Sequence, residues 1–356
     1  MKKIYLSLIV LLGMGYSVSA QTVQSTDDTF KPSGRPIVTV FSDFTNVNYN
    51  GRSNNAFEVT RAYFGYGYNF SSDFSGKVIF DIANSASISV TDGLNLTDKK
   101  ITGTLPSAYS VYLKNAYAEY NHGILKADLG VIGENIFDLQ ESVWGKRYLY
   151  KSFQDVYGFG NTTDLGAKIK LQFIPEVALD LAVFNGEGFK KTQADSTVQL
   201  AVGLTIQPVK NFFARVYVDY LNYSKIPISS AIVAQTTFSA FVGYKSEKGS
   251  LGVEYNLQSG HASTKDNDWS GISIYGTLPV IEKLSVFARF DDLISKKIGT
   301  ATQGWNTTTD GQVYIAGVEF VPVKGIQISP NIRYSNLSAT DAKATTTINL
   351  NLGMNF

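Results

Sequence analysis

Residues Thr345–Phe356, TTTINLNLGMNF, alternate between polar and apolar side chains. Every second residue from Ile348 to Phe356 is apolar, and the residues between them are Asn or Gly. Successive side chains of a β-strand point to opposite faces, so this stretch predicts a strand with one apolar and one polar face. Soluble sandwich strands also alternate in this way. The composition of the rest of the chain therefore decides which kind of sheet the strand joins.

The composition favours a sheet in contact with lipid. The 356 residues include 21 Tyr, 22 Phe and 31 Gly, and charged residues make up 17%, below the roughly 25% usual in soluble domains. No apolar run after Ala20 reaches the roughly 20 residues that a membrane helix needs. Every backbone polar group in lipid needs a partner, which only helices and closed sheets provide. We therefore predict an all-β fold, a transmembrane antiparallel β-barrel.

The first 36 residues are expected to lie outside the barrel. Lys2 and Lys3 precede a short apolar run, and Val18-Ser19-Ala20 supplies small residues for cleavage, so residues 1–20 are predicted to be a secretory signal peptide. Residues 21–36 are polar and predict a flexible periplasmic segment. The barrel is expected to occupy residues 37–356.

Charge and cysteine content exclude several classes of protein. The chain has no Cys, which rules out disulfides and thiolate metal sites. Without Lys2 and Lys3 it keeps all 30 acidic residues and loses two of its 31 basic ones, so it is nearly neutral. This balance gives no indication of nucleic-acid binding, and no motif predicts a cofactor or a metal site.

Short turns and longer connections alternate along the chain, as in barrels with periplasmic turns and external loops. Seven short turns join fourteen strands, and the first and last strands bring the predicted number to sixteen. The turns fall at 71–73, 121–123, 175–176, 208–211, 247–249, 279–283 and 322–325. The longer connections are 48–55, 86–107, 134–163, 188–197, 224–235, 260–268, 295–310 and 336–343. Sixteen strands enclose a water-filled channel.

Alternation predicts which charged side chains line that channel: Arg61, Lys77, Asp81, Lys126, Asp128, Lys168, Lys170, Arg215, Asp219, Arg289, Asp291 and Arg333. Most of them need do no more than hydrate the interior. Arg215 and Arg289 are singled out because each follows Ala and precedes an inward carboxylate. Fixed charges of this kind set the field that a passing ion meets.

One predicted strand departs from alternation. In Ala108–Asn121, Lys114 and Glu119 would lie on opposite faces of a regular strand. A β-bulge within the strand would bring both to the channel.

The connection Glu134–Thr163 is too apolar for a loop exposed to water. Its large apolar side chains, among them Phe137 and Trp144, need a surface to pack against. We expect this third external loop to fold into the channel, face a basic wall that includes Lys168, Lys170 and Arg215, and form its narrowest section. Its candidate charged residues are Glu134, Asp138, Glu141, Lys146 and Arg147.

Two other functions are open to a membrane barrel, that of an outer-membrane enzyme and that of an adhesin or structural barrel. A hydrolase needs a His within reach of a nucleophile, but His122 is expected in a turn and His261 in an external loop. An adhesin would have fewer strands, a filled interior and longer loops. The acidic loop around Asp266–Asp268 lacks the spacing of an EF-hand.

The chain resembles the phosphate-selective porin family of bacterial outer-membrane porins. The resemblance lies in Arg61–Asn84, Leu113–Gln140 and Asp164–Gly188, including Phe184-Asn185-Gly186. It implies a 16-stranded, usually trimeric porin of the Gram-negative outer membrane, with a constriction loop and small hydrophilic solutes or ions, phosphate included, as cargo. The chain departs from the family in having few inward arginines.

The C-terminal strand resembles the closing strand of outer-membrane barrels. That resemblance implies that Phe356 forms part of an assembly signal read by the barrel-assembly machinery, and that outer-membrane lipid surrounds the folded chain.

Overall fold

The computed structural model describes residues 30–84, 89–90, 103–104, 109–193, 196–222, 232–296, 307–338 and 343–356. The predicted signal peptide, residues 1–20, and most of the predicted segment 21–36 lie outside these residues. The first strand begins at Ser33, before the predicted start of the barrel at Ile37. The reason is that residues 33–36 already pair with the end of the second strand.

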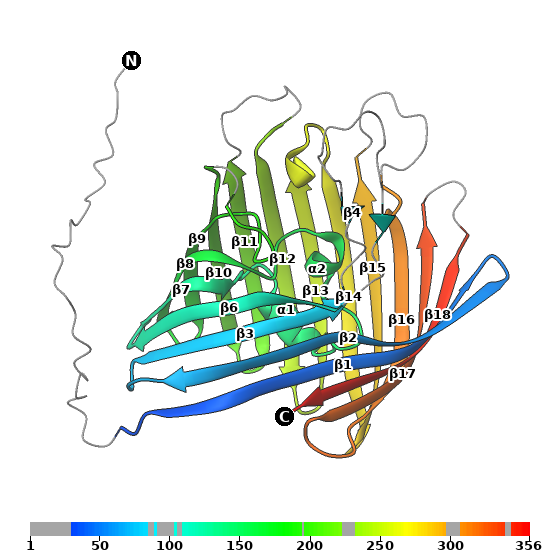
Figure 1. Ribbon diagram of the computed structural model, residues 1–356, viewed down its shortest axis with the longest axis horizontal. Helices are drawn as coiled ribbons and strands as arrows, with labels where there is room; N and C mark the ends of the chain where they lie inside the picture. Colours follow the sequence, from blue (N-terminus) through cyan, green and yellow to red (C-terminus); the bar gives the residue numbers. More distant parts are fainter. Residues whose placement is uncertain are drawn as a thin grey trace. The chain divides into compact units, whose positions relative to one another are not determined.

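Sixteen strands form one closed antiparallel barrel (Figure 1), in which neighbours in sequence pair and the last strand pairs with the first. The strands are β1 (Ser33–Tyr49), β2 (Arg52–Asn69), β3 (Phe74–Asn84), β6 (Tyr109–His122), β7 (Leu125–Gly133), β8 (Thr163–Ile174), β9 (Val177–Phe184), β10 (Val198–Val209), β11 (Phe212–Asn222), β12 (Gln235–Ser246), β13 (Gly249–Ser259), β14 (Trp269–Ile281), β15 (Leu284–Ser295), β16 (Gly311–Phe320), β17 (Ile326–Leu337) and β18 (Thr345–Asn355). Two short strands, β4 (Ser89–Val90) and β5 (Gly103–Thr104), pair with each other. The predicted fold class and strand number are confirmed.

The closing strand behaves as its alternation predicts. In β18 the side chains of Thr347, Asn349 and Asn351 are buried, whereas Ile348 and Leu350 are exposed on the outer face. β18 pairs with β1 from Thr39↔Asn355 to Tyr49↔Thr345. Beyond the strand, the backbone N–H of Phe356 donates to the carbonyl of Val38 at 3.0 Å, and the Phe356 ring is exposed.

All seven predicted short turns join the expected strands, and they define the turn end of the barrel. The predicted connection 48–55 is wrong, because β1 and β2 continue to a two-residue turn at Asn50-Gly51. Both turn residues have positive φ, 49° and 75°. Asn-Gly is the pair that tolerates this conformation best, so it closes a tight hairpin where a longer loop was expected.

The predicted bulge is present in β6. Ile79 of β3 pairs with Asn115 and Phe80 pairs with Leu113, so Lys114 is the extra residue. The bulge lets Lys114 and Asn115, consecutive in sequence, both reach the interior. This explains why simple alternation failed in this strand.

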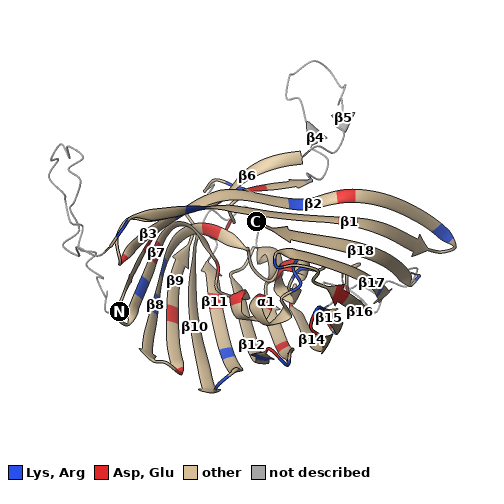
Figure 2. Cartoon of the chain, turned by 90° about the horizontal axis from the view of Figure 1, so that it is seen from below, with Lys and Arg blue, Asp and Glu red and all other residues tan. Residues whose placement is uncertain are grey.

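The connection between β7 and β8 folds inside the barrel. It contains two short helices, α1 (Asp138–Trp144) and α2 (Phe153–Tyr157), and Figure 2 shows α1 within the ring of strands. α1 packs against β12, β13 and β14. No helix in the described ranges is long and apolar enough to cross a membrane. The inward-folded loop is confirmed, and its helices were not predicted.

Two apolar clusters fix the loop to the strands. One contains Ile136, Phe153 and Phe159 of the loop with Phe184 and Tyr217 of the barrel. The other joins Val143 and Trp144 to side chains that include Phe241, Tyr275, Phe287 and Ile315. Full burial of one such side chain contributes about 1.5–3 kcal/mol. The large apolar residues that made an exposed loop improbable therefore form the core of the molecule.

Candidate functional site

Arg215 of β11 holds the beginning of the inward loop. Its guanidinium donates to both oxygens of Asp180 on β9, at 2.7 and 2.9 Å, and to the Asn135 carbonyl at 2.8 Å. Gly203 of β10 lies between the two charged residues. A Cβ there would sit 2.2 Å from the Arg215 Nη2 atom, so only Gly lets the ion pair cross this strand.

Arg289 of β15 holds the second half of the loop in the same way. It forms two 2.8 Å hydrogen bonds with Asp291, and Nη1 donates to the Lys151 carbonyl at 2.6 Å. Its guanidinium also lies 5.2 Å from the ring centres of Trp144 and Tyr150. Both partners of the Arg289–Asp291 pair are fully buried.

The middle of the loop is fixed by Glu319 of β16. One carboxylate oxygen accepts from the Lys146 ammonium and the other from the Tyr148 hydroxyl, each at 2.8 Å. Arg147 points elsewhere, pairing with Asp155 at 2.8 Å and with Glu141. Loop charges are therefore satisfied largely by the loop itself or by the strands that it covers.

The two ends of the loop meet at Glu134, which is fully buried. One carboxylate oxygen accepts from the Asn161 backbone N–H at 3.2 Å, and the other has no hydrogen-bond partner among the described residues. Burial raises the pKa of Glu134 well above its usual range, and the nearby Asp219 and Asp164 raise it further. The root of the loop therefore carries a buried carboxyl group whose pKa is raised.

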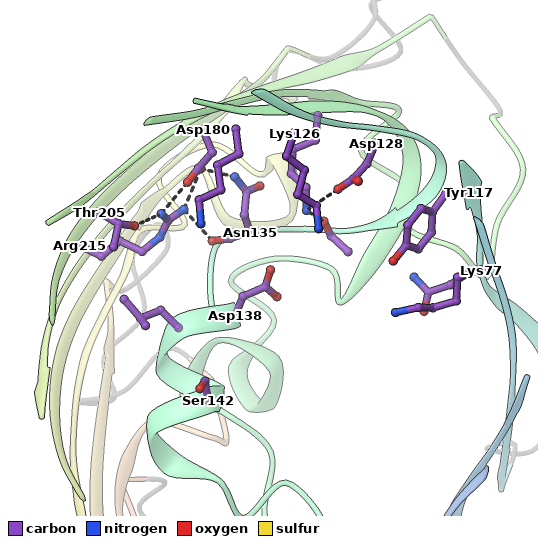
Figure 3. Close-up of a pocket in the computed structure, with 15 residues that line it drawn as sticks. Lys77, Tyr117, Lys126, Asp128, Asn135, Asp138, Ser142, Asp180, Thr205 and Arg215 are labelled. Carbon is purple, nitrogen blue, oxygen red and sulfur yellow. Dashed lines mark hydrogen bonds and ion pairs between the residues drawn. The ribbon is translucent and has the colours of Figure 1, made fainter. Parts of the chain in front are cut away.

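A cavity of about 510 Å³ lies between the loop and the opposite strands, as Figure 3 shows. Asp138 and Ser142 of α1 line one side. The strand side carries cations from β3, β7 and β8, namely Lys77, Lys126, Lys168 and Lys170. We call β2, β3, β6, β7 and β8 the open wall, and β11 to β15, which lie against the loop, the covered wall.

The cations of this cavity are only partly neutralised. Lys126 pairs with Glu119 at 2.8 Å, and Lys168 lies 3.6 Å from Asp128. Within the ranges that the structure describes, Lys77 and Lys170 have no carboxylate in ion-pairing distance. Lys126 and Lys170 are direct partners in the β7–β8 register. Like charges opposite each other destabilise a sheet, so an anion between them would relieve a cost of folding.

The structure separates the predicted channel-lining residues into two groups. Cavities between loop and strands are lined by Arg61, Lys77, Lys126, Asp128, Lys168, Lys170, Arg215 and Arg333. Asp219, Arg289 and Asp291 lie buried on the covered wall, and Asp81 is buried against Arg61 at 2.6 Å. Arg215 and Asp128 belong to both groups, since they line the cavity and are buried.

Both histidines are held by contacts with neighbouring side chains. His122 is the last residue of β6, where a turn was predicted, and its Nδ1 lies 3.0 Å from an oxygen of Asp73. His261 stacks on Trp269 at 3.6 Å and contacts Gln258, and burial lowers the pKa of His261 to about 4. Within the described ranges, neither ring is hydrogen-bonded to a hydroxyl group, and no group of three or more acidic or His side chains could hold a metal.

Several residues of the site were missed from the sequence. Asp180 falls at an inward position of β9, and the alternation of DLAVF could have revealed it. Glu319 and Asn135 could not be paired with the loop from the sequence, because their partners lie 173 and 80 residues away. Lys114 was noticed only as an irregularity.

No family model matches the chain, and no curated protein matches it. Solved structures match over nearly its whole length. DcaP, an outer membrane channel of Acinetobacter baumannii, is 15% identical, with a TM-score of 0.61, covering 91% of this chain and 97% of that one. OmpF of Salmonella typhi gives 10% identity, a TM-score of 0.65 and coverages of 91% and 97%.

An anion-selective porin from Comamonas acidovorans gives 7% identity, a TM-score of 0.62 and coverages of 92% and 100%. At these identities the likeness establishes the fold. The chain therefore has the sixteen-stranded barrel fold of the bacterial outer-membrane porins.

Proposed function

We propose that the protein is a porin of the Gram-negative outer membrane, through which small hydrophilic solutes diffuse passively and anions pass preferentially. The observation that carries this proposal is the cavity between the inward loop and the open wall. The lysine cluster that lines it consists of Lys77, Lys126, Lys168 and Lys170. Two of these, Lys77 and Lys170, have no carboxylate partner in the described ranges. Fixed cations on a water-filled wall favour the entry of anions.

The inward loop is proposed to form the narrowest section of the channel. Arg215, Arg289 and Glu319 bond it to the strands, and two apolar clusters bury it. A loop fixed at this many points sets an aperture of constant size rather than a mobile cover. Phosphate is one of the anions that we propose as cargo, supported by the resemblance of Arg61–Asn84 and Leu113–Gln140 to the phosphate-selective porins.

We also propose that the barrel-assembly machinery reads the C-terminal strand and that three chains assemble, as the resemblance implies. Phe356 ends the pairing of β18 with β1 and presents its ring on the outer face. Phe356→Asp is expected to lower the amount of folded protein in the outer membrane, measured by surface labelling and heat-modifiable mobility. A normal level of folded protein in that variant would contradict the assembly role.

Ion selectivity tests the proposal directly. The purified full-length protein in a planar bilayer, under a tenfold KCl gradient, is expected to show a reversal potential of the sign given by chloride permeation. The double variant Lys126→Glu/Lys170→Glu should shift that potential toward potassium. The control is Lys248→Glu, which makes the same Lys-to-Glu change at one exposed turn residue. A folded barrel that passes no current would overturn the proposal.

A further inference from the structure

Aromatic rings and cations form a series inside the barrel, from the connection after β9 across β6 and β2 to β1, away from the lysine cluster. Lys190, in the connection after β9, lies 4.8 Å from the ring centre of Tyr112 and 5.7 Å from that of Phe189. Lys114 follows, 5.0 Å from Phe189 and 5.4 Å from the ring of Tyr63. Each cation thus contacts two rings, and Phe189 is shared between the two lysines.

The series continues to the inward loop. Arg61 lies 6.0 Å from the centre of the Tyr63 ring, and that ring meets Phe41 edge-on at 6.0 Å. Phe41 in turn lies 6.4 Å from Tyr148 of the loop. We call Lys190, Tyr112, Phe189, Lys114, Tyr63, Arg61 and Phe41 the aromatic–cationic row.

The row ends at a second cavity, of about 350 Å³, between the loop and strands β1, β2 and β17. Arg61, Arg333, Tyr148 and Tyr150 are among the residues that line it. Arg333 lies 5.0 Å from the Tyr150 ring centre and, in the part of the chain that is described, has no carboxylate within ion-pairing distance. The cavity therefore repeats the chemistry of the row, a guanidinium beside an aromatic ring.

The bulge in β6 lies within the row, at Lys114. Tyr112 pairs with Asp81 and points inward, Lys114 lies two residues further on and faces the same side, and the bulge lets Asn115 face that side too. A regular strand would have to give up either Lys114 or Asn115 from the interior. Bulges frequently re-aim a side chain beside a functional site.

The row is open to a solute, and two of its three cations are not neutralised; the third, Arg61, pairs with Asp81. Tyr63, Tyr112, Lys114 and Phe189 are partly exposed, and Lys190 is exposed. Among the described residues, Lys114 and Lys190 have no carboxylate within ion-pairing distance, and Lys114 bonds only the Thr162 hydroxyl, at 3.1 Å. A cation held over a ring keeps its charge, because the ring attracts it without neutralising it.

We propose that this row and the cavity at its end form a binding path for solutes that combine an aromatic ring with an anionic group, such as an aromatic carboxylate. The ring of the solute packs against the partly exposed side chains of Tyr112, Tyr63 and Phe41, and its carboxylate moves from one cation to the next. The inference rests on the proposed porin function and deepens it. Inorganic anions have no face to stack, so the lysine cluster alone serves them.

Benzoate is the probe that tests the path. The full-length protein in a planar bilayer first shows its KCl current, and benzoate is then added. We expect benzoate to reduce the current at about tenfold lower concentration than acetate, because only benzoate can use the rings. Benzylammonium, which has the ring and the opposite charge, should have no effect at the concentration where benzoate halves the current.

Variants localise the effect. Lys114→Gln and Tyr63→Leu should each raise the half-blocking benzoate concentration by about three- to tenfold, with acetate unaffected. Lys248→Gln, the same substitution at an exposed turn, should leave it unchanged. Heat-modifiable mobility confirms that each variant is folded.

The possible failures are distinguishable. Equal block by benzoate and acetate in a conducting wild-type channel would overturn the path and leave the porin function standing. So would a loss of benzoate block in Lys248→Gln as large as in Lys114→Gln. Absence of KCl current from folded wild-type protein would overturn the porin function, and the path with it.

Discussion

The covered wall and the open wall use the same charged residue types for different purposes. On the covered wall, Arg289 and Asp291 form a fully buried ion pair, and the remaining donor of Arg289 bonds a carbonyl of the loop. On the open wall, Lys170 and Lys77 face a cavity, with no carboxylate in ion-pairing distance among the described residues. An inward position is therefore not by itself a channel-lining position. What matters is whether the loop covers the side chain and whether a carboxylate neutralises it.

The largest effect should come from removing the loop that creates the difference between the walls. Deletion of Gln140–Gln154 takes away most of α1 and the Lys146–Glu319 contact. Single-channel conductance is expected to rise several-fold, because the fixed constriction is lost. Heat-modifiable mobility shows whether the shortened chain still folds. Unchanged conductance in a folded variant would mean that the aperture lies elsewhere.

A buried ion pair that anchors the loop should contribute more to the free energy of unfolding than an exposed ion pair does. Asp180→Ala leaves the Arg215 guanidinium buried without its carboxylate, a change that costs about 3–5 kcal/mol in comparable buried pairs. Asp266→Ala removes a half-exposed partner of Lys296, worth about 0–1 kcal/mol. Urea unfolding in lipid vesicles, followed by Trp fluorescence, measures both. Equal losses would contradict the anchoring role.

The stability of the protein should depend on pH through Glu134, at the root of the loop. Burial and the nearby Asp219 and Asp164 raise the pKa of Glu134 in the folded barrel. The folded state then holds this proton to higher pH than the unfolded chain, so stability falls as pH rises from about 4.3 through the folded pKa.

Glu134→Gln removes that titration. The variant is expected to lose less stability than wild type between pH 5 and pH 9, measured by unfolding in urea at each pH. Glu282→Gln, at an exposed turn residue, is the matched control and should follow wild type. A Glu134→Gln variant with the wild-type pH dependence would show that the carboxyl is not responsible.

The fold could be predicted from the sequence because strand geometry is local. Alternation in β10 and β18, and turn residues between the strands, determine faces and hairpins without knowledge of distant contacts. The bulge at Lys114 was detectable for the same reason, since it breaks a local pattern. The tight turn at Asn50-Gly51 was not predicted, because the residues on either side of it are polar, as in a loop. In the structure these residues pair as strands.

The site was less predictable because it depends on pairs between distant strands. Arg215 was expected to act with Asp219, four residues ahead, but it crosses β10 to Asp180 through the space left by Gly203. The position of the loop over the covered wall decides which cations remain free. That position depends on contacts such as Tyr148 with Glu319, 171 residues apart.

The central claim is that uncovered, unpaired cations of the open wall give the channel its preference for anions, and it is tested by reversal potentials under a KCl gradient. Two variants alter the same cavity. Lys170→Gln removes an unpaired cation, and Arg215→Met/Asp180→Leu removes a neutral buried pair. We predict that Lys170→Gln lowers the chloride-to-potassium permeability ratio and that the double variant keeps the wild-type ratio. A wild-type ratio in Lys170→Gln, or an equal fall in both variants, would contradict the account.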